Sequence, residues 1–476
     1  MPARKVGLPG DVPQSLARGL VAIRAAMQVP DDFPADVVAA AEQAAAAPRL
    51  PEADRTDLEL LSIDPPGSRD LDQALHIARR PEGGFVVSYA IADVAAFVTA
   101  GDPVDLEAHR RGTTLYAPDH RTPLHPPVLS EGAASLLADR TRPALLWTVR
   151  LDGQGQTTEA TVSRALVRNR EQLTYEQAQA EIDSGSARES LALLKEVGQL
   201  REQRERDRGG VSLQIPEQEI RAEGDSWSLV LRAPLPVEGW NAQISLLTGM
   251  AAAHLMLYGQ VGILRSLPPA DQGSLRKLRQ TAKALDIAWP AELDYPEFVR
   301  RLDPTRGADA AMLNACTMLF RGAGYRSFSG GVPDAAEHAA LASDYAHVTA
   351  PLRRLVDRYA NEICVVLCAD RPVPDWVLLA LDALPAEMAG ADRRAKKYER
   401  SIIDLVEVCL LSTRVGETFA ATVIETEENK SRGVVLIADP AVEARVSGEH
   451  LPLGQEIVVR LVSADFSTGV VAFELA

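Results

Sequence analysis

Three aspartates, Asp64, Asp70 and Asp72, stand close together in the segment LLSIDPPGSRDLDQAL. The Pro-Pro-Gly run after the first of them prevents a strand or helix from continuing, so we expect a loop that turns the acids toward one another. Carboxylates confined in this way repel one another unless they are protonated or bridged by cations, and their hard oxygens favour Mg²⁺ or Mn²⁺. Ions held there can activate a water molecule and stabilise charge on a phosphodiester oxygen. The segment therefore predicts a divalent-cation site suited to phosphodiester hydrolysis, with a loop that only caps a helix from Leu71 onward as the alternative.

The elements that must position these acids begin at Leu58, where the pattern becomes strand-like. LELLSID and GGFVVSYAIADVAAFV are rich in β-branched and aromatic residues, and the Gly-Gly pair indicates a turn between neighbouring strands. A proline-rich extended segment (TLYAPDHRTPLHPPVLS), a further strand (ALLWTVRLDGQG) and a highly charged helix (LLKEVGQLREQRERDR) follow. Residues 241–260 and 374–412 have the spacing of helices. We expect one large mixed α/β domain.

The two ends of the chain have patterns of their own. Residues 14–28 place apolar side chains at helical spacing, and ADVVAAAEQAAAA predicts a second helix after the turn VPDDFP. These two helices fit either a helix-turn-helix or a packing appendage, and we favour the appendage. Beyond Arg414, short alternating strands (FAATVIE, RGVVLIA, EIVVRLVSAD, GVVAFEL) are typical of a five-stranded barrel.

The overall composition indicates a globular protein of about two to four domains, since 46% of the 476 residues are hydrophobic and 24% are charged. No apolar run approaches the roughly 20 residues of a membrane-spanning helix, and the amino terminus MPARKVGLPG lacks the apolar core of a secretory signal, so we expect a cytoplasmic protein without a membrane partner. The net charge of -16 argues against nucleic acid unless basic residues line a channel inside an acidic shell.

The cysteines are too few and too unevenly spaced for a disulfide framework, so we expect all four to be reduced and buried: Cys316, Cys364, Cys368 and Cys409. Cys364 and Cys368 lie one helical turn apart, which would suit a shared metal. No nearby His or Cys completes a zinc site, so small buried hydrophobes are the favoured interpretation.

The loop IDPPGSRDLDQAL resembles the D-x5-D-x-D-D-A-L signature of the ribonuclease II and R family, the RNB exoribonucleases. Further segments resemble motifs of this family in the same order along the chain: YAIADVAAFV, RGTTLYAPDHRTPLHPPVLSEGAASL, QLTYEQAQ and EHAALASDYAHVTAPLRRLVDR. The resemblance extends over roughly residues 56–410, and the terminal strands resemble the OB-fold RNA-binding domain that ends many members. It implies a mixed α/β fold with a helical N-terminal domain (1–55), a large RNB-like α+β catalytic domain (56–412) and an OB-fold barrel (413–476).

The resemblance assigns Asp64, Asp70 and Asp72 to the binding or orientation of Mg²⁺, with Mn²⁺ as a second option, and makes Asp70 and Asp72 catalytic. Gln73 occupies the fourth acidic position of the family signature. Its amide oxygen can still coordinate a cation, but without the negative charge we expect a weaker affinity for a second ion.

Two arginines in APLRRLVD resemble the family arginines at the scissile phosphate. The resemblance assigns Arg353 to transition-state charge stabilisation, because a guanidinium group can fork onto phosphate oxygens. From the residues alone, an arginine at the start of a helix that pairs with Asp357 is the alternative. RNA contacts are implied at Tyr116, Tyr175, His347, Arg353, Arg354 and Asn241.

The implied RNA contacts differ in kind. Tyr116 matches a tyrosine that stacks on the terminal base, and stacking tolerates any base. Tyr175 matches a tyrosine near the RNA path, with a packing residue as the alternative, and His347 either touches RNA or is a hydrogen-bonded core histidine. Leu213, in GGVSLQIP, stands where the family has a second stacking aromatic residue, and Asn241 stands where an acidic residue contacts the ribose.

Together, the residues and the resemblance predict a monomeric, processive 3′→5′ exoribonuclease that hydrolyses single-stranded RNA to nucleoside 5′-monophosphates with metal-activated water. Because the first signature aspartate is Asp64, we expect no upstream cold-shock barrels and a less gated channel that admits partly structured RNA. The alternatives are a catalytically weakened RNA-binding protein on the same fold and a nucleic-acid-binding regulator whose amino-terminal helices contact DNA.

Overall fold

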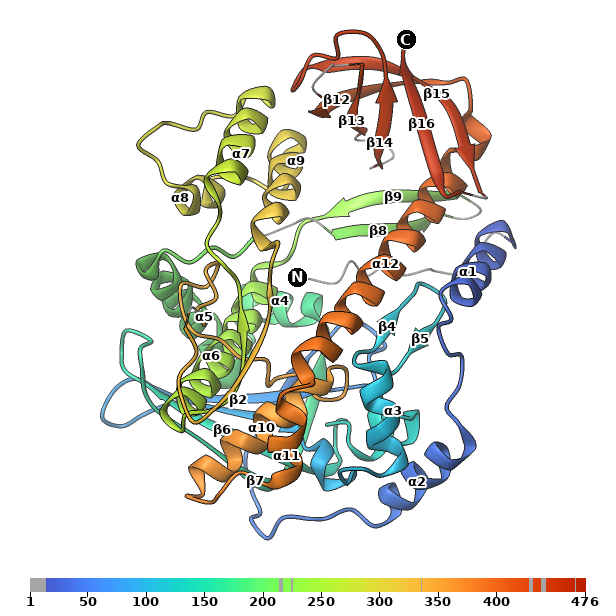
Figure 1. The fold of residues 1–476 in the computed structure, drawn as a ribbon. Coiled ribbons are helices and arrows are strands. Elements are labelled where there is room, and N and C mark those ends of the chain that lie inside the picture. The colour runs from blue at the N-terminus through green and yellow to red at the C-terminus, as the bar shows by residue number, and fades with distance from the viewer. Residues whose placement is uncertain are drawn as a thin grey trace.

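The structure, a computed structural model, describes residues 14–213, 217–223, 226–334, 336–427, 431–437, 442–466 and 468–476. The large central region is built on a closed barrel in the strand order β1-β2-β3-β6-β7, at the base of the view in Figure 1. Its strands are β1 (Leu60–Ile63), β2 (Gln73–Arg79), β3 (Phe85–Ala92), β6 (Thr141–Leu151) and β7 (Thr157–Leu173). Neighbouring strands are antiparallel except β1 and β7, which are parallel.

In the barrel strands, successive side chains point to opposite faces of the sheet. Successive residues of β3 pack into two different apolar clusters, with Val87 and Tyr89 in one and Ala90 in the other. The turn that precedes β3 requires glycine, since Gly84 has φ +80° and a Cβ there would lie 2.1 Å from the carbonyl oxygen of Leu151. The predicted strand β3 and the turn before it are therefore confirmed. The prediction that β3 is the neighbour of β1 is wrong, because β2, which was not predicted, lies between them.

Helices cover the barrel on the side of the Tyr89 cluster. They are α4 (Tyr175–Ser184), α5 (Glu189–Arg208), α6 (Pro236–Tyr258), α10 (Leu355–Cys368) and α11 (Asp375–Leu381). The helix predicted over residues 241–260 is confirmed as part of α6. The helix predicted over 374–412 is instead two helices, α11 and α12 (Leu384–Leu411), because Pro385 in the first turn of α12 has no N–H with which to continue a helix.

The amino-terminal helices pack against different parts of the large central region. Helix α1 (Gln14–Ala26) lies on α12, where Leu16 and Leu20 contact Tyr398 and Ile402. Helix α2 (Ala35–Ala46) lies on α3 (Pro103–Arg111). Helices of a helix-turn-helix pack against each other, so within the described residues this arrangement favours the packing appendage.

A second closed barrel ends the chain, in the strand order β12-β13-β14-β16-β15 at the top of Figure 1, and it confirms the predicted five-stranded barrel. Its strands are β12 (Thr418–Thr426), β13 (Arg432–Ile437), β14 (Val442–Ser447), β15 (Glu456–Asp465) and β16 (Val470–Leu475). The barrel contacts the helices α7 (Gln272–Ala284) and α9 (Gly307–Ala315), since Lys277 pairs with Glu425 at 2.8 Å and Asn314 bonds to Glu443 at 2.8 Å. Helix α8 (Tyr295–Arg300) belongs to the same apolar cluster as α7 and α9.

Short elements complete the large central region. Two hairpins are formed by β4 (Leu115–Tyr116) with β5 (Arg121–Thr122) and by β8 (Glu217–Glu223) with β9 (Ser226–Arg232), and a further two-stranded sheet is formed by β10 (Val261–Ser266) and β11 (Gly324–Ser329). The 3-10 helices are η1 (Val94–Ala96), η3 (Cys316–Phe320) and η4 (Ser412–Arg414). The segment η2 (Leu129–Ala133) is a π-helix.

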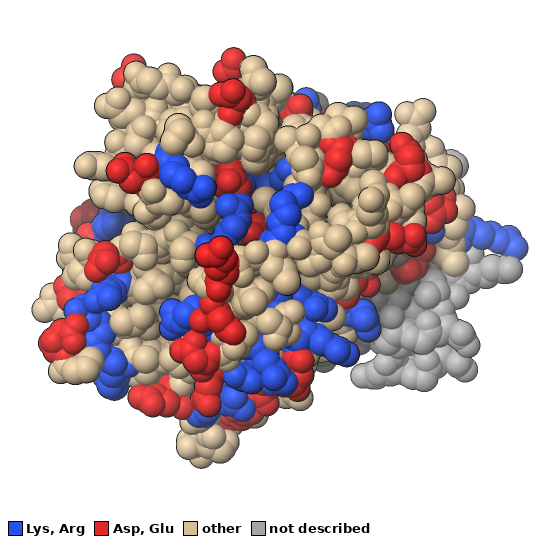
Figure 2. All heavy atoms as spheres, turned by 90° about the horizontal axis from the view of Figure 1, so that it is seen from below, with Lys and Arg blue, Asp and Glu red and all other residues tan. Residues whose placement is uncertain are grey.

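The four cysteines are free. Cys316 and Cys364 are buried as predicted, whereas Cys368 and Cys409 are only partly buried, because each lies toward the end of a helix rather than in its packed middle. None of the helices in the described part of the chain has both the length and the apolar character needed to span a membrane. On the face seen from below, acidic and basic side chains are interspersed (Figure 2), so the net negative charge does not form one acidic field there.

Candidate active site

The acidic loop lies at one edge of the barrel of the large central region. Strand β1 ends at Ile63 and β2 begins at Gln73, and because the two strands are antiparallel neighbours, this end of β1 adjoins the start of β2. Asp64 continues the pairing of β1, since its N–H donates to the carbonyl of Leu173 at 3.0 Å. The alternative of a helix-capping loop is wrong, because the chain beyond Leu71 enters a strand.

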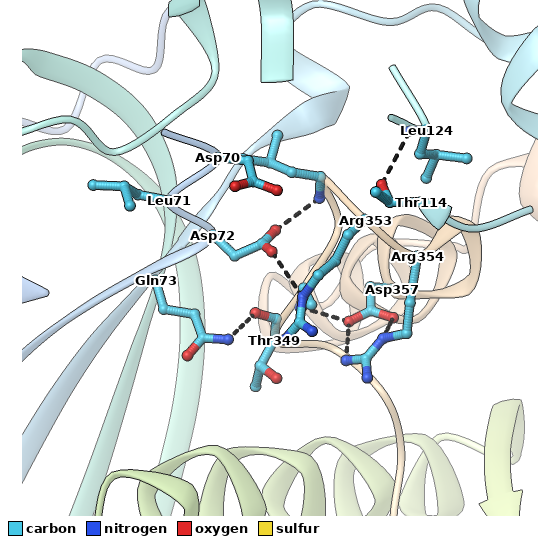
Figure 3. Close-up of polar contacts among 12 residues, drawn as sticks. Asp70, Leu71, Asp72, Gln73, Thr114, Leu124, Thr349, Arg353, Arg354 and Asp357 are labelled. Atoms are coloured by element: carbon cyan, nitrogen blue, oxygen red, sulfur yellow. Dashed lines mark hydrogen bonds and ion pairs between the residues drawn. The ribbon is translucent and has the colours of Figure 1, made fainter. Parts of the chain in front are cut away.

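Asp72 is buried and held from two sides (Figure 3). Its Oδ1 accepts a hydrogen bond from the Leu352 N–H at 2.8 Å, and its Oδ2 accepts one from Arg353 Nε at 3.2 Å. Burial raises the pKa of Asp72 to about 7, although the charge of Arg353 and the Leu352 amide oppose the shift. Two motifs far apart in the sequence therefore converge on one carboxylate.

Asp70 belongs to a second ion pair. The guanidinium of Arg121 donates Nη1 to Asp70 Oδ1 and Nη2 to Glu131 Oε1, the latter at 2.5 Å. Arg121 and Glu131 were not predicted as site residues. Both are within the segment RGTTLYAPDHRTPLHPPVLSEGAASL, but no local pattern indicates that this segment lies against the acidic loop, so only the fold brings them together.

The charge of Asp64 acts on two tyrosines, Tyr89 and Tyr175. Burial and then the charge of Asp64 raise the pKa of Tyr175 to about 12, opposed by a hydrogen bond to Asn241. Tyr175 begins helix α4, whose start is capped by Thr174. The structure thus brings together Asp64, Tyr175 and Asn241, which come from three separate elements.

The amide of Gln73 is fully engaged in hydrogen bonds. Its Nε2 donates to the Thr349 carbonyl at 2.7 Å, and its Oε1 accepts from the hydroxyls of Tyr89 and, at 3.4 Å, Ser245. Figure 3 shows the side chains of Gln73 and Asp72 both extending to one segment, which Gln73 contacts at Thr349 and Asp72 at Arg353. Its assignment as a metal ligand stays a prediction, and that role would require exchange of the Tyr89 contact.

The two arginines have different partners. Arg354 binds the buried Asp357 through Nε at 2.9 Å and Nη2 at 2.8 Å. The alternative of an arginine at the helix start that pairs with Asp357 therefore describes Arg354, whereas Arg353 contacts Asp72. The Arg353 side chain contacts Asp72 but keeps 42% exposure, against 5% for the Asp72 side chain. Its carbonyl accepts from the Thr114 N–H at 3.0 Å, which joins this segment to the chain that leads into β4. Arg353 can therefore present charge to a ligand while Asp72 stays buried.

Tyr116 lies beside the acidic loop and His347 lies in an aromatic cluster. Tyr116 and Asp70 line one cavity of about 460 Å³ together with Arg121. The Nδ1 of His347 bonds to the Tyr325 hydroxyl at 2.7 Å, and burial, followed by Arg354, holds the pKa of this histidine well below its usual range. This environment matches the interpretation of His347 as a hydrogen-bonded core histidine, and its contact with RNA stays a prediction.

Leu213 packs against the apolar cluster of α7, α8 and α9. An aliphatic side chain in such a cluster contributes to packing, so the structure gives Leu213 no role beyond the core of that subregion.

The donor set fits a hard divalent cation by its chemistry. Three carboxylates lie at neighbouring strand ends, and burial, together with the charges of Asp70 and Asp357, raises the pKa of Asp72, which a bound cation would counteract. In the described ranges, however, no three acidic, His or Cys side chains converge on a point that could hold an ion. Arg121 contacts Oδ1 of Asp70 and Arg353 contacts Oδ2 of Asp72, so an ion that bound either of these two oxygens would displace an arginine.

Comparison with known families gives two matches. Residues 53–365 match the RNB domain, and residues 417–476 match the RNase II-type exonuclease C-terminal S1 domain. The first match contains all the predicted site residues, and the second coincides with the barrel of β12 to β16.

Individual relatives cover different parts of the chain. The exosome complex exonuclease RRP44 homolog A of Arabidopsis thaliana is 28% identical over 65% of this chain, and the chain spans only 35% of that protein. Among solved structures, Mycoplasma genitalium RNase R in complex with ribose methylated single-stranded RNA superposes with a TM-score of 0.84 and 18% identity, covering 97% of this chain and 78% of that one. Yeast Ssd1, a pseudonuclease, superposes with a TM-score of 0.68 and 17% identity over 88% and 55% of the two chains. These two likenesses establish the fold.

Proposed function

Since the chain belongs to the RNB family of ribonuclease II and R type exoribonucleases, we propose that it is itself a divalent-cation-dependent 3′→5′ exoribonuclease. It would degrade single-stranded RNA, and also partly structured RNA, processively to nucleoside 5′-monophosphates. The observation that carries this proposal is the contact of Arg353 Nε with Asp72 Oδ2 at 3.2 Å, because it joins a partly exposed guanidinium to the buried carboxylate of the acidic loop.

The protein's own residues would position the phosphate. Asp72 orients Arg353, and the Leu352 amide fixes the other carboxylate oxygen, so the guanidinium is held before RNA arrives. The remaining donors of Arg353 would bind the oxygens of the scissile phosphate and stabilise the charge that develops there. A hard cation bound by Asp64, Asp70 and Asp72 would supply an activated water molecule at this phosphate.

Other predicted contacts would hold the nucleotide. Tyr116 is placed beside Asp70, where it would stack on the terminal base without a preference for its identity. Tyr175 and Asn241, which are hydrogen-bonded to each other, would contact the ribose, and a contact with its 2′-hydroxyl is what would distinguish RNA from DNA. We also propose the domain boundaries 1–55, 56–412 and 413–476 and Mg²⁺ as the cofactor, with Mn²⁺ as a substitute.

The test is digestion of RNA labelled at its 5′ end by the purified chain with Mg²⁺. We expect full-length RNA to be converted to a short labelled end product with few intermediates, and uniformly labelled RNA to release nucleoside 5′-monophosphates; EDTA should abolish both. Asp72→Asn should remove digestion but retain RNA binding, whereas Asp57→Asn, at a side chain with 68% exposure, should digest normally. Retained digestion by Asp72→Asn would overturn the site assignment. A hairpin with a 3′ overhang extends the assay, and a stem that blocks digestion completely would contradict the action on partly structured RNA.

A second candidate is an RNA-binding protein of the same fold with weakened catalysis. It is favoured by Gln73, which replaces a carboxylate and whose amide is already engaged by Thr349 and Tyr89. This candidate predicts that the wild-type chain binds RNA as tightly with EDTA as with Mg²⁺ and releases no mononucleotide. The digestion assay therefore separates the two.

A further inference from the structure

Arg121 connects two carboxylates that come from different elements. It projects from β5 and donates one terminal nitrogen to Asp70 and the other to Glu131 of η2. The side chains of Asp70 and Arg121 keep only 14% and 25% exposure, so solvent screens this pair less than a pair on the open surface. Asp70 is therefore already paired with a positive side chain, the guanidinium of Arg121.

A divalent ion would compete for the same carboxylate. Hard cations are coordinated by carboxylate oxygens at short distance, and Oδ1 of Asp70 already accepts from Arg121. A guanidinium in contact with that oxygen would also repel an ion placed beside it. The pair between Arg121 and Asp70 thus opposes binding of the ion.

Arg121 has both a second partner and space in which to move. Its other nitrogen donates to Glu131 at 2.5 Å, so the guanidinium would keep one carboxylate partner if the contact to Asp70 were broken. Arg121 also lines the cavity of about 460 Å³ next to Asp70. In the hairpin it lies directly opposite Tyr116, so displacement of the arginine takes place beside the predicted base-stacking residue.

We propose that Arg121 is a positioning residue that occupies Asp70 in the absence of a divalent cation and competes with the cation for this carboxylate. This inference rests on the proposed function, because it takes the acidic loop to be the cation site. The inference goes beyond that function because it names Arg121 as a group that lowers the affinity for the cation. Arg121 should lower this affinity in addition to the decrease that follows from the missing carboxylate at position 73.

The test measures cation binding without RNA and without turnover. Mn²⁺ is titrated into the full chain and the free ion is followed by electron paramagnetic resonance. Arg121→Gln should bind Mn²⁺ roughly ten-fold more tightly than the wild type, because a positive charge within a few ångströms of the site is lost. Arg24→Gln is the matched control, since Arg24 pairs at 3.0 Å with Asp119 near the same hairpin and should bind as the wild type does.

A second variant guards against a failure to fold, which thermal unfolding without cation would reveal. Arg121→Lys keeps the charge but cannot reach both carboxylates with a planar fork, so it should show a smaller rise in affinity in the same direction. Unchanged or weaker binding in both Arg121 variants, with measurable wild-type binding, would overturn the inference while leaving the proposed function intact. Absence of Mn²⁺ binding in every variant, together with absence of digestion, would overturn both.

Discussion

Asp72 links the stability of the fold to pH. Asn at this position keeps the shape of the side chain and an oxygen for the Leu352 amide but removes the ionisation. The folded-state pKa of Asp72, about 7, lies above its ordinary value of 3.8. The contribution of this carboxyl to stability is therefore complete below pH 3.8 and is lost progressively as the pH rises to 7.

The magnitude follows from the width of that interval. Each pH unit within it corresponds to about 1.4 kcal/mol, so the wild type should lose about 3 kcal/mol of unfolding free energy through Asp72 between pH 5 and pH 7. Asp72→Asn lacks this loss but weakens the contact to Arg353, which costs about 1 kcal/mol at every pH. The variant should therefore have nearly the stability of the wild type at pH 5, within about 1 kcal/mol, and should be more stable by about 3 kcal/mol at pH 8.

The assay is urea unfolding with EDTA at several pH values between 5 and 8, followed by tryptophan fluorescence, to which the buried Trp147 of the barrel contributes. Asp57→Asn controls for removal of a carboxylate outside the site. Parallel curves of stability against pH for the wild type and Asp72→Asn would refute the reasoning, because they would mean that Asp72 ionises as freely in the folded chain as in the unfolded one.

Three further predictions concern other parts of the site. Arg354→Ala leaves the buried Asp357 without its guanidinium and should lower the unfolding free energy by about 3–5 kcal/mol in urea unfolding, whereas a loss below 1 kcal/mol would mean that water solvates Asp357. Tyr116→Ala should weaken RNA binding by about 1–3 kcal/mol in fluorescence anisotropy, equally for all sequences, while Tyr116→Phe binds normally; a loss confined to one base would contradict stacking. Replacing Lys396 and Lys397, exposed on α12, by Gln should reduce the slope of log affinity against log salt by about 1–2, and an unchanged slope would place RNA elsewhere.

Much of the local structure could be predicted from the residues themselves. The β-branched and aromatic residues of FVVSYAIA and the Gly-Gly pair predict β3 and the turn before it, because strand preference and positive φ are local properties. The same holds for the strands of the terminal barrel. The break between α11 and α12 was missed, although Pro385 is visible in the sequence, because the apolar spacing continues across it.

The contacts within the candidate site were less predictable. The convergence of Asp72 and Arg353 followed from the family resemblance rather than from the residues, since nothing local indicates that two segments so far apart will meet. The pair of Arg121 and Asp70 was missed for the same reason. The partners of Gln73 also depend on the fold, because they come from three different elements.

The hydrogen bonds of Gln73 indicate how a substitution of this residue would affect the neighbouring arginine. Asp72 accepts from the Leu352 amide, and the neighbouring Gln73 donates to the Thr349 carbonyl, so two adjacent residues of the chain anchor the segment that carries Arg353. A carboxylate at position 73 would face that carbonyl with like partial charge and would release one of the two anchors. A variant with a fourth acid at position 73 would therefore also loosen the segment that carries Arg353, so a stronger cation site would come with a less firmly held arginine.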